Sequence, residues 1–117
     1  MKVIPHRLIN NSILEIDIYG LIFDVWWDED CIGTKDLKRT IENYPNASEI
    51  HLRFNTEGGD TVEGQAMYNI LKDINKKKVG FIDGMCASAG GLLLCACDET
   101  YARNNTLFMM HNPYIRT

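Results

Sequence analysis

The sequence lacks any apolar run long enough to cross a membrane, and its N-terminus has no apolar segment of the kind found in secretion signals. It also lacks a basic stripe, and the formal net charge of the 117 residues is −4. Neither a membrane nor a nucleic acid is therefore the expected main partner. With no linker, repeat or low-complexity tract, we expect a single domain over residues 1–117, located in the cytoplasm.

The four cysteines show none of the paired spacings that zinc sites and disulfide frameworks use. Cys95 and Cys97 are two residues apart in a helical pattern, so they point to different faces. Cys31 and Cys86 are isolated in the sequence. We expect small buried thiols in a reducing compartment, with no bound metal and no cofactor.

Strand patterns alternate with helical patterns along the chain. The alternation of apolar and polar residues predicts strands over 12–19, 50–54, 78–83, 101–102 and 107–110. Apolar residues at helical spacing predict helices over 35–44, 61–74 and 87–97, with Thr34 and Thr61 as N-caps of the first two. Repeated β-then-α units favour a sheet of mostly parallel strands with helices outside it.

Residues 83–91 have the pattern of a strand end, a tight turn of small residues and a helix start. On such a turn the hydroxyl of Ser88 is held near unpaired backbone N–H groups, which can stabilise an oxyanion. The alternative is an ordinary serine N-cap in a helix-packing turn. Taken by itself, the turn favours the ordinary cap, because such turns are common before helices.

Two other stretches change this weighting. Residues 54–61 read Phe-Asn-Thr-Glu-Gly-Gly-Asp-Thr, a strand end followed by a glycine pair and a helix start. Residues 108–113 read Phe-Met-Met-His-Asn-Pro, an apolar strand that ends in a histidine. A serine nucleophile needs an adjacent base, and His111 lies at a strand end, where α/β sheets collect their sites. The alternative for His111 is a structural side chain bonded to backbone.

In this order, the Gly-Gly loop, Ala-Ser-Ala-Gly and Met-Met-His-Asn-Pro resemble the motifs of Clp-type serine peptidases. The resemblance covers about Ile13 to Pro113 and is closest to the Clp-like head-maturation proteases of tailed phages. It implies an α/β fold, the ClpP/crotonase-like ββα spiral, truncated at the C-terminus. It also implies roles residue by residue: Ser88 as nucleophile, His111 as general base, and the backbone N–H groups of Gly59 and Ala89 as the oxyanion hole.

The sequence departs from the family pattern in two places. Thr56-Glu57 stand where relatives usually carry Ser-Pro, so the loop lacks a stiffening proline. The family takes its third catalytic residue, usually an aspartate, and its ring-forming helix from the segment after the histidine motif. Asp83 and Asp98 are in-chain substitutes, but neither matches the family position. We therefore expect the third residue downstream of residue 117, and a weakly active or inactive 117-residue chain that forms dimers or irregular oligomers.

The resemblance thus implies an ATP-independent serine endopeptidase, with a role as a phage head-maturation protease. The expected partners are polypeptide substrates such as capsid or scaffold proteins, other copies of the chain, and an AAA+ unfoldase if the protein is a housekeeping Clp. Its expected location is then the bacterial host cytoplasm or the phage prohead. Two alternatives stay open: a crotonase-type acyl-CoA enzyme, against which the pair of Ser88 and His111 argues, and a catalytically inactive Clp-like assembly or scaffold module.

Trp26 and Trp27 form an aromatic pair directly before an acidic loop. Adjacent residues on an extended segment point to opposite faces. Two interpretations stay open: both side chains pack within the monomer, or one of them makes a contact between subunits.

Overall fold

The computed structural model describes residues 2–25, 28 and 30–109. Trp26, Trp27 and His111 lie outside these described residues. The elements, in chain order, are β1 (His6–Ile9), β2 (Ile13–Ile22), β3 (Cys31–Ile32), α1 (Thr34–Glu42), β4 (Glu49–Gly59), α2 (Thr61–Asp73), β5 (Lys77–Ala87), α3 (Ala89–Cys95), β6 (Glu99–Ala102) and β7 (Leu107–Met109).

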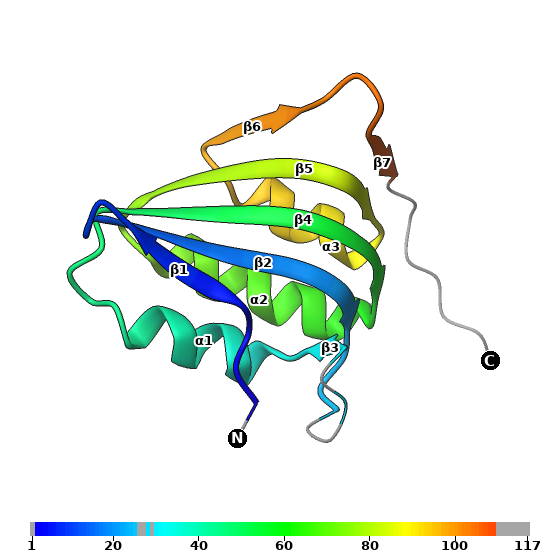
Figure 1. Ribbon diagram of the computed structural model, residues 1–117. Coiled ribbons are helices and arrows are strands. Elements are labelled where there is room, and N and C mark those ends of the chain that lie inside the picture. The colour runs from blue at the N-terminus through cyan, green and yellow to red at the C-terminus, as the bar shows by residue number, and fades with distance from the viewer. Residues whose placement is uncertain (1, 26–27, 29, 110–117) are drawn as a thin grey trace.

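The described strands form one sheet, with the three described helices together on one of its faces (Figure 1). The strand order is β1-β2-β4-β5-β6; β3 pairs with β2, and β7 pairs with β5. Only β1 is antiparallel to its neighbour among these pairs. The prediction of a mostly parallel sheet with helices outside is therefore confirmed.

The core lies between the helices and the face of the sheet that they cover. Strand β4 alternates buried and more exposed residues, and β2 does so apart from Glu15, which is also buried, so one side of each strand enters the core. The fully buried side chains of these two strands include Leu14, Ile16, Ile18, Ile50, Leu52 and Phe54. From the helices, Leu37, Met67, Leu71 and Leu93 complete the same cluster. No described helix is long and apolar enough to span a membrane.

The helix starts differ by one residue from those that the sequence predicts. Gly33, not Thr34, is the N-cap of α1, and its N–H donates to the Asp36 carboxylate at 3.0 Å. Asp60, not Thr61, caps α2, and its Oδ1 accepts from the N–H of Val62 at 2.9 Å. An aspartate thus satisfies an N–H group at each helix start, from the cap itself at α2 and from the first turn at α1.

The strand β5 is longer than predicted and α3 is shorter, because the extended backbone continues to Ala87. Among the apolar residues whose spacing predicts this helix, Met67 and Leu71 are buried, but Val62 is 75% exposed. At the N-terminal end of α2 the contact with α3 is made instead by Gly64: a Cβ there would lie 2.8 Å from the Cβ of Ala89. The absence of a side chain lets the two helix backbones approach closely.

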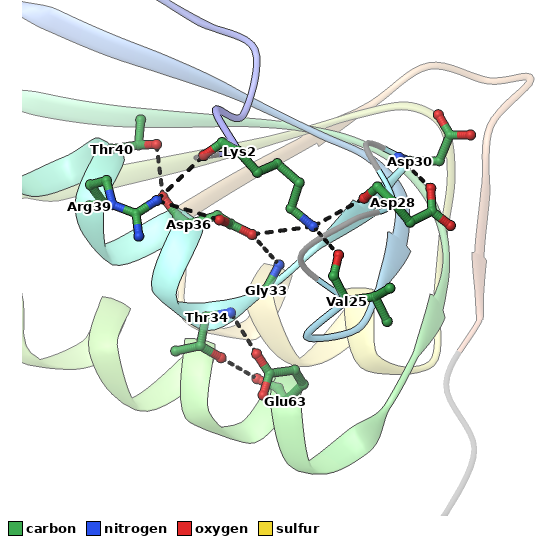
Figure 2. Close-up of polar contacts among 10 residues, drawn as sticks. All are labelled: Lys2, Val25, Asp28, Asp30, Gly33, Thr34, Asp36, Arg39, Thr40 and Glu63. Carbon is green, nitrogen blue, oxygen red and sulfur yellow. Dashed lines mark hydrogen bonds and ion pairs between the residues drawn. The ribbon is translucent and has the colours of Figure 1, made fainter.

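Lys2 ties the N-terminal segment to the loop that precedes α1 (Figure 2). Its Nζ donates to the carbonyl oxygens of Val25 at 2.7 Å and Asp28 at 3.1 Å, and lies 3.6 Å from the Asp36 carboxylate. The N–H of Thr34 donates to Glu63 on α2 at 2.6 Å. These contacts fix the chain after β2 against α1 and α2.

Replacement of Gly64 by alanine tests the close packing of α2 on α3. In an exposed helix, Gly→Ala stabilises by about 1 kcal/mol. Here we expect the opposite sign, a loss of about 1–3 kcal/mol, because the new methyl group overlaps Ala89. Urea denaturation measures the change, with Gln65→Ala on the exposed side of the same helix as the control. A Gly64→Ala variant as stable as the parent chain would contradict this packing.

Candidate active site

Ser88 lies on the sharp turn between β5 and α3. Its backbone has φ 52° and ψ −120°, a left-handed region that a serine adopts only at a cost of about 1–3 kcal/mol. Although Ser88 occupies the N-cap position of α3, its hydroxyl makes no capping hydrogen bond to the helix. The hydroxyl is thus not used as an ordinary cap, which was the alternative that the sequence left open.

The Gly-Gly loop at the end of β4 packs directly against this turn. A Cβ on Gly58 would lie 2.6 Å from the carbonyl oxygen of Ala87, 2.8 Å from Ser88 Cβ and 2.9 Å from the nitrogen of Ala89. Gly58 has φ 95° and Gly59 has φ 149°, both in the region that favours glycine. Only a residue without a side chain fits at Gly58, so this glycine sets the distance between the loop and the serine.

The hydroxyl of Thr56 holds the loop in place. Thr56 is 2% exposed, and its Oγ1 donates to the carbonyl oxygen of Gly20 at 2.6 Å and accepts from the N–H of Gly58 at 3.0 Å. On the far side of Gly59, the N–H of Asp60 donates to the carbonyl oxygen of Ile22 at 2.9 Å. The loop is therefore fastened to β2 on both sides of Gly59, although it lacks the expected proline.

The strand β7 brings the segment before His111 to the serine turn. In the parallel pairing of β7 with β5, Met109 is the partner of Ala87, and the carbonyl oxygen of Met109 accepts from the N–H of Ser88 at 2.9 Å. Met109 is two positions before His111, which lies outside the described residues. The predicted pairing of Ser88 Oγ with the His111 ring thus stays a prediction, whereas the approach of the two segments is a feature of the fold.

The side chain of Asp83 contacts Arg53 and Tyr19 on the face of the sheet that the described helices do not cover. Its carboxylate forms an ion pair with Arg53, which donates from Nε at 3.0 Å, and it accepts from the Tyr19 hydroxyl at 2.6 Å. Burial alone would raise the pKa of Asp83, but the hydrogen bonds from Arg53 and Tyr19 outweigh burial and lower this pKa. Asp83 is five residues before Ser88 along β5, and its carboxylate is already bonded to Arg53 and Tyr19.

Asp98 lies at the opposite end of the same strand. Its carboxylate accepts from the backbone N–H of Lys78 at 2.8 Å, and its own N–H donates to the Lys78 carbonyl oxygen. Lys78 is ten residues before Ser88 along an extended chain, a separation of roughly 30 Å at ~3.3 Å per residue. Neither Asp83 nor Asp98 is therefore placed to orient a base beside Ser88.

The nearest thiol does not compete with the serine as a nucleophile. Cys86 is fully buried against α3, and burial raises the pKa of its thiol to about 12. The thiols of Cys31 and Cys86 are buried as predicted, whereas Cys95 is exposed. Over residues 2–25, 28 and 30–109, no three histidine, cysteine, aspartate or glutamate side chains form a cluster that could hold a metal ion.

The family of this chain follows from its sequence, together with the mostly parallel sheet, the Gly-Gly loop and the strained Ser88. A sequence profile of the Clp protease family matches residues 39–117, more than half of the chain, and the chain belongs to this family. A curated relative, the ATP-dependent Clp protease proteolytic subunit 2 of Thermobifida fusca (strain YX), is 38% identical over 69 residues. These residues are 56% of this chain and 33% of the relative, so the chain spans about a third of the relative's length.

Solved structures of the family show the same fold. A point mutant of ClpP1 from Listeria monocytogenes superposes with a TM-score of 0.72 at 22% identity, over 85% of this chain and 56% of that chain. Unmutated ClpP1 from the same organism gives a TM-score of 0.71 at 23% identity over the same shares. The predicted α/β ClpP-like fold is confirmed over about half of the ClpP chain. The named relatives are bacterial ClpP subunits rather than phage proteases.

Sequence reasoning did not identify Thr56 as a structural link or Arg53 as the partner of Asp83. Thr56 was noticed only as a departure from the family motif. Its place between the buried Phe54 and Gly58 in a period of two was an available signal, because it puts the hydroxyl on the core side of β4. Nothing in the sequence pattern marked the pairing of Arg53 with Asp83, which are 30 residues apart.

Removal of the Thr56 hydroxyl should loosen the loop. Thr56→Val keeps the shape of the side chain but leaves the N–H of Gly58 and the carbonyl oxygen of Gly20 without this partner. We expect a loss of about 1–3 kcal/mol in the free energy of unfolding. Thr56→Ser, which keeps the hydroxyl, is the matched control and should retain most of the stability in urea denaturation. Equal stability of the two variants would argue against a linking role for the hydroxyl.

The lowered pKa of Asp83 predicts a pH-dependent contribution to stability. A carboxylate whose pKa is lowered in the folded state stabilises it above the ordinary aspartate value of 3.8, and this contribution is lost as the pH falls through the folded pKa. Asp83→Asn should therefore cost about 1–2 kcal/mol at pH 6 and progressively less below pH ~3.8. Denaturation at a series of pH values measures this, with the exposed Asp73→Asn as control. A cost that is constant with pH would contradict the ion pair.

Proposed function

We propose that this chain is the nucleophile-bearing part of a Clp-type serine endopeptidase. The single observation that carries the proposal is the strained, non-capping Ser88, with the strand that leads to His111 docked on its N–H. A residue held in an unfavourable backbone conformation by a close-fitting glycine loop is typical of a functional site rather than of a packing turn. Membership of the Clp protease family agrees with this chemistry.

In the proposed mechanism, Ser88 Oγ attacks the carbonyl carbon of the scissile peptide bond while His111 takes the hydroxyl proton. The N–H groups of Gly59 and Ala89 stabilise the oxyanion of the tetrahedral intermediate. His111 then gives the proton to the leaving amine, and an acyl-enzyme remains on Ser88. A water molecule, deprotonated by His111, attacks the acyl group and releases the acid, and the proton returns to Ser88.

Two features of the site support these roles. The N–H of Ala89 is the first of α3, at a position where helices leave N–H groups without an intrahelical acceptor. Met109, two positions before His111 in the sequence, accepts a hydrogen bond from the N–H of Ser88, so the strand that leads to the proposed base is docked on the nucleophile turn. The acid that orients His111 is proposed to lie outside the described residues, since Asp83 and Asp98 are occupied elsewhere.

A fluorophosphonate probe tests the proposal, because it labels only an activated serine. We expect slow labelling of the parent chain, in keeping with the weak activity expected from its sequence, and a further loss of at least tenfold in labelling rate for Ser88→Ala and for His111→Ala, since removal of a triad member costs several orders of magnitude. Ser12→Ala, on a turn far from the site in the sequence, is the control. Labelling that persists in Ser88→Ala, or labelling of the parent chain no faster than that of Ser88→Ala, would overturn the proposal.

Self-association is the second part of the proposal. Leu107, Phe108 and Met109 on β7 and Tyr101 on β6 are each about half exposed and form an apolar border on one edge of the sheet. Exposed large apolar side chains of this kind are common at interfaces between subunits. The long apolar side of α3, by contrast, is buried within the described chain. Analytical ultracentrifugation, with Phe108→Ser as a variant, distinguishes association through this border from a monomer.

The narrower role as a head-maturation protease of a tailed phage rests on the resemblance of the motifs. The named relative is described as an ATP-dependent proteolytic subunit, and the corresponding role for this chain would require an AAA+ unfoldase. Degradation of a folded substrate only with unfoldase and ATP would support the housekeeping role. Cleavage of capsid or scaffold proteins without ATP would support the phage role.

A further inference from the structure

An open pocket of about 400 Å³ lies beside the Gly-Gly loop, on the face of the sheet that the described helices do not cover. It is built from the C-terminal ends of β2 and β4 and from the part of β5 around Met85, where the pairing with β4 shifts register. Its lining residues are Gly20, Leu21, Asn55, Thr56, Glu57 and Met85. Its volume is within the range of pockets that bind small ligands or single side chains.

The walls of this pocket are fastened to the serine turn. Thr56 Oγ1 bonds to Gly20 and to Gly58, and Gly58 touches the backbone on both sides of Ser88. On the other wall, Asn55 Oδ1 accepts from the N–H of Met85 at 3.2 Å. Met85 is three residues before Ser88 on the same strand. Three residues of extended chain span roughly 10 Å, so the pocket is within reach of substrate residues next to a scissile bond at Ser88.

The pocket combines an apolar wall with one carboxylate. Leu21 and Met85 supply apolar surface, and Leu21 is 40% exposed. Glu57 is exposed at the pocket, and within the described part of the chain no ion pair engages its carboxylate. The one arginine nearby on β4, Arg53, is neutralised by Asp83. The net charge of the chain, −4, also favours the approach of a cation.

We propose that this pocket is a specificity site for a lysine or arginine side chain of the polypeptide substrate, within two residues of the scissile bond. The methylene groups of the basic side chain lie on Leu21 and Met85, and the cation pairs with the Glu57 carboxylate. The inference rests on the proposed peptidase function and assigns it a substrate class. It gives a role to Glu57, the residue that stands where relatives usually carry proline.

Peptide binding to the Ser88→Ala chain tests this inference without any need for hydrolysis. Fluorescent peptides that differ only in one residue, lysine, glutamine, glutamate or leucine, are titrated and their Kd values measured by fluorescence anisotropy. We expect the lysine peptide to bind about three- to tenfold more tightly than the glutamine peptide, the range for a partly exposed ion pair. Glu57→Gln should remove this preference, and Glu57→Lys should transfer it to the glutamate peptide.

Glu42→Gln, an exposed charge removed from α1 on the helical side of the sheet, is the matched control and should leave the preference unchanged. Equal binding of all four peptides, no binding, or tightest binding of the leucine peptide in the parent and in Glu57→Gln would each overturn the inference. Failure of the proposed function gives a different result: the Glu57-dependent preference persists, but Ser88 neither reacts with a fluorophosphonate nor cleaves the lysine peptide.

Discussion

The approach of Gly58 to the backbone of Ser88 is the contact on which the candidate site depends. Two parallel strands end side by side, and a methyl group on the first would overlap three backbone or Cβ atoms of the second. The pairing of β4 with β5 shifts register just before this point, between Phe54 and Thr56, so that β5 has extra residues there. The irregular segment carries the chain of β5 around the glycine and into the strained conformation of Ser88. The loop, the serine and the helix α3 are thus one packing unit.

Much of the fold could be predicted from the sequence because burial on one side gives strands and helices a clear period. Leu14, Ile16 and Ile18 alternate as a strand, and Met67 and Leu71 share a helix face. The helix caps were missed by one residue because a threonine, itself a common cap, directly follows the actual cap at both starts, Gly33-Thr34 and Asp60-Thr61. Strand β1 was not predicted, because its residues are only half-buried. It pairs with β2 after a turn at Asn10 and Asn11, which both have positive φ.

For the candidate site, the sequence could supply residue types and their order but not their connections. That Ser88, Gly58 and Met109 meet follows from strand order, since β4, β5 and β7 end at the same side of the sheet. The ties that hold them are hydrogen bonds from a buried hydroxyl and from a main-chain N–H, and neither leaves a periodic signal in the sequence. The same holds for the Arg53 and Asp83 pair, whose partners come from neighbouring strands at positions set by register.

The way in which β5 is covered along its outer side has a consequence for the dynamics of the site. This side is shared by two short strands: β6 pairs with Val79–Ile82, and the three residues of β7 pair with Met85–Ala87. Short, exposed edge strands belong to the part of a fold that opens with the least free energy. Detachment of β7 would break the hydrogen bond to Ser88 while the strands from β1 to β5 stay folded. Local opening, rather than global unfolding, therefore limits how long the two halves of the candidate site stay together.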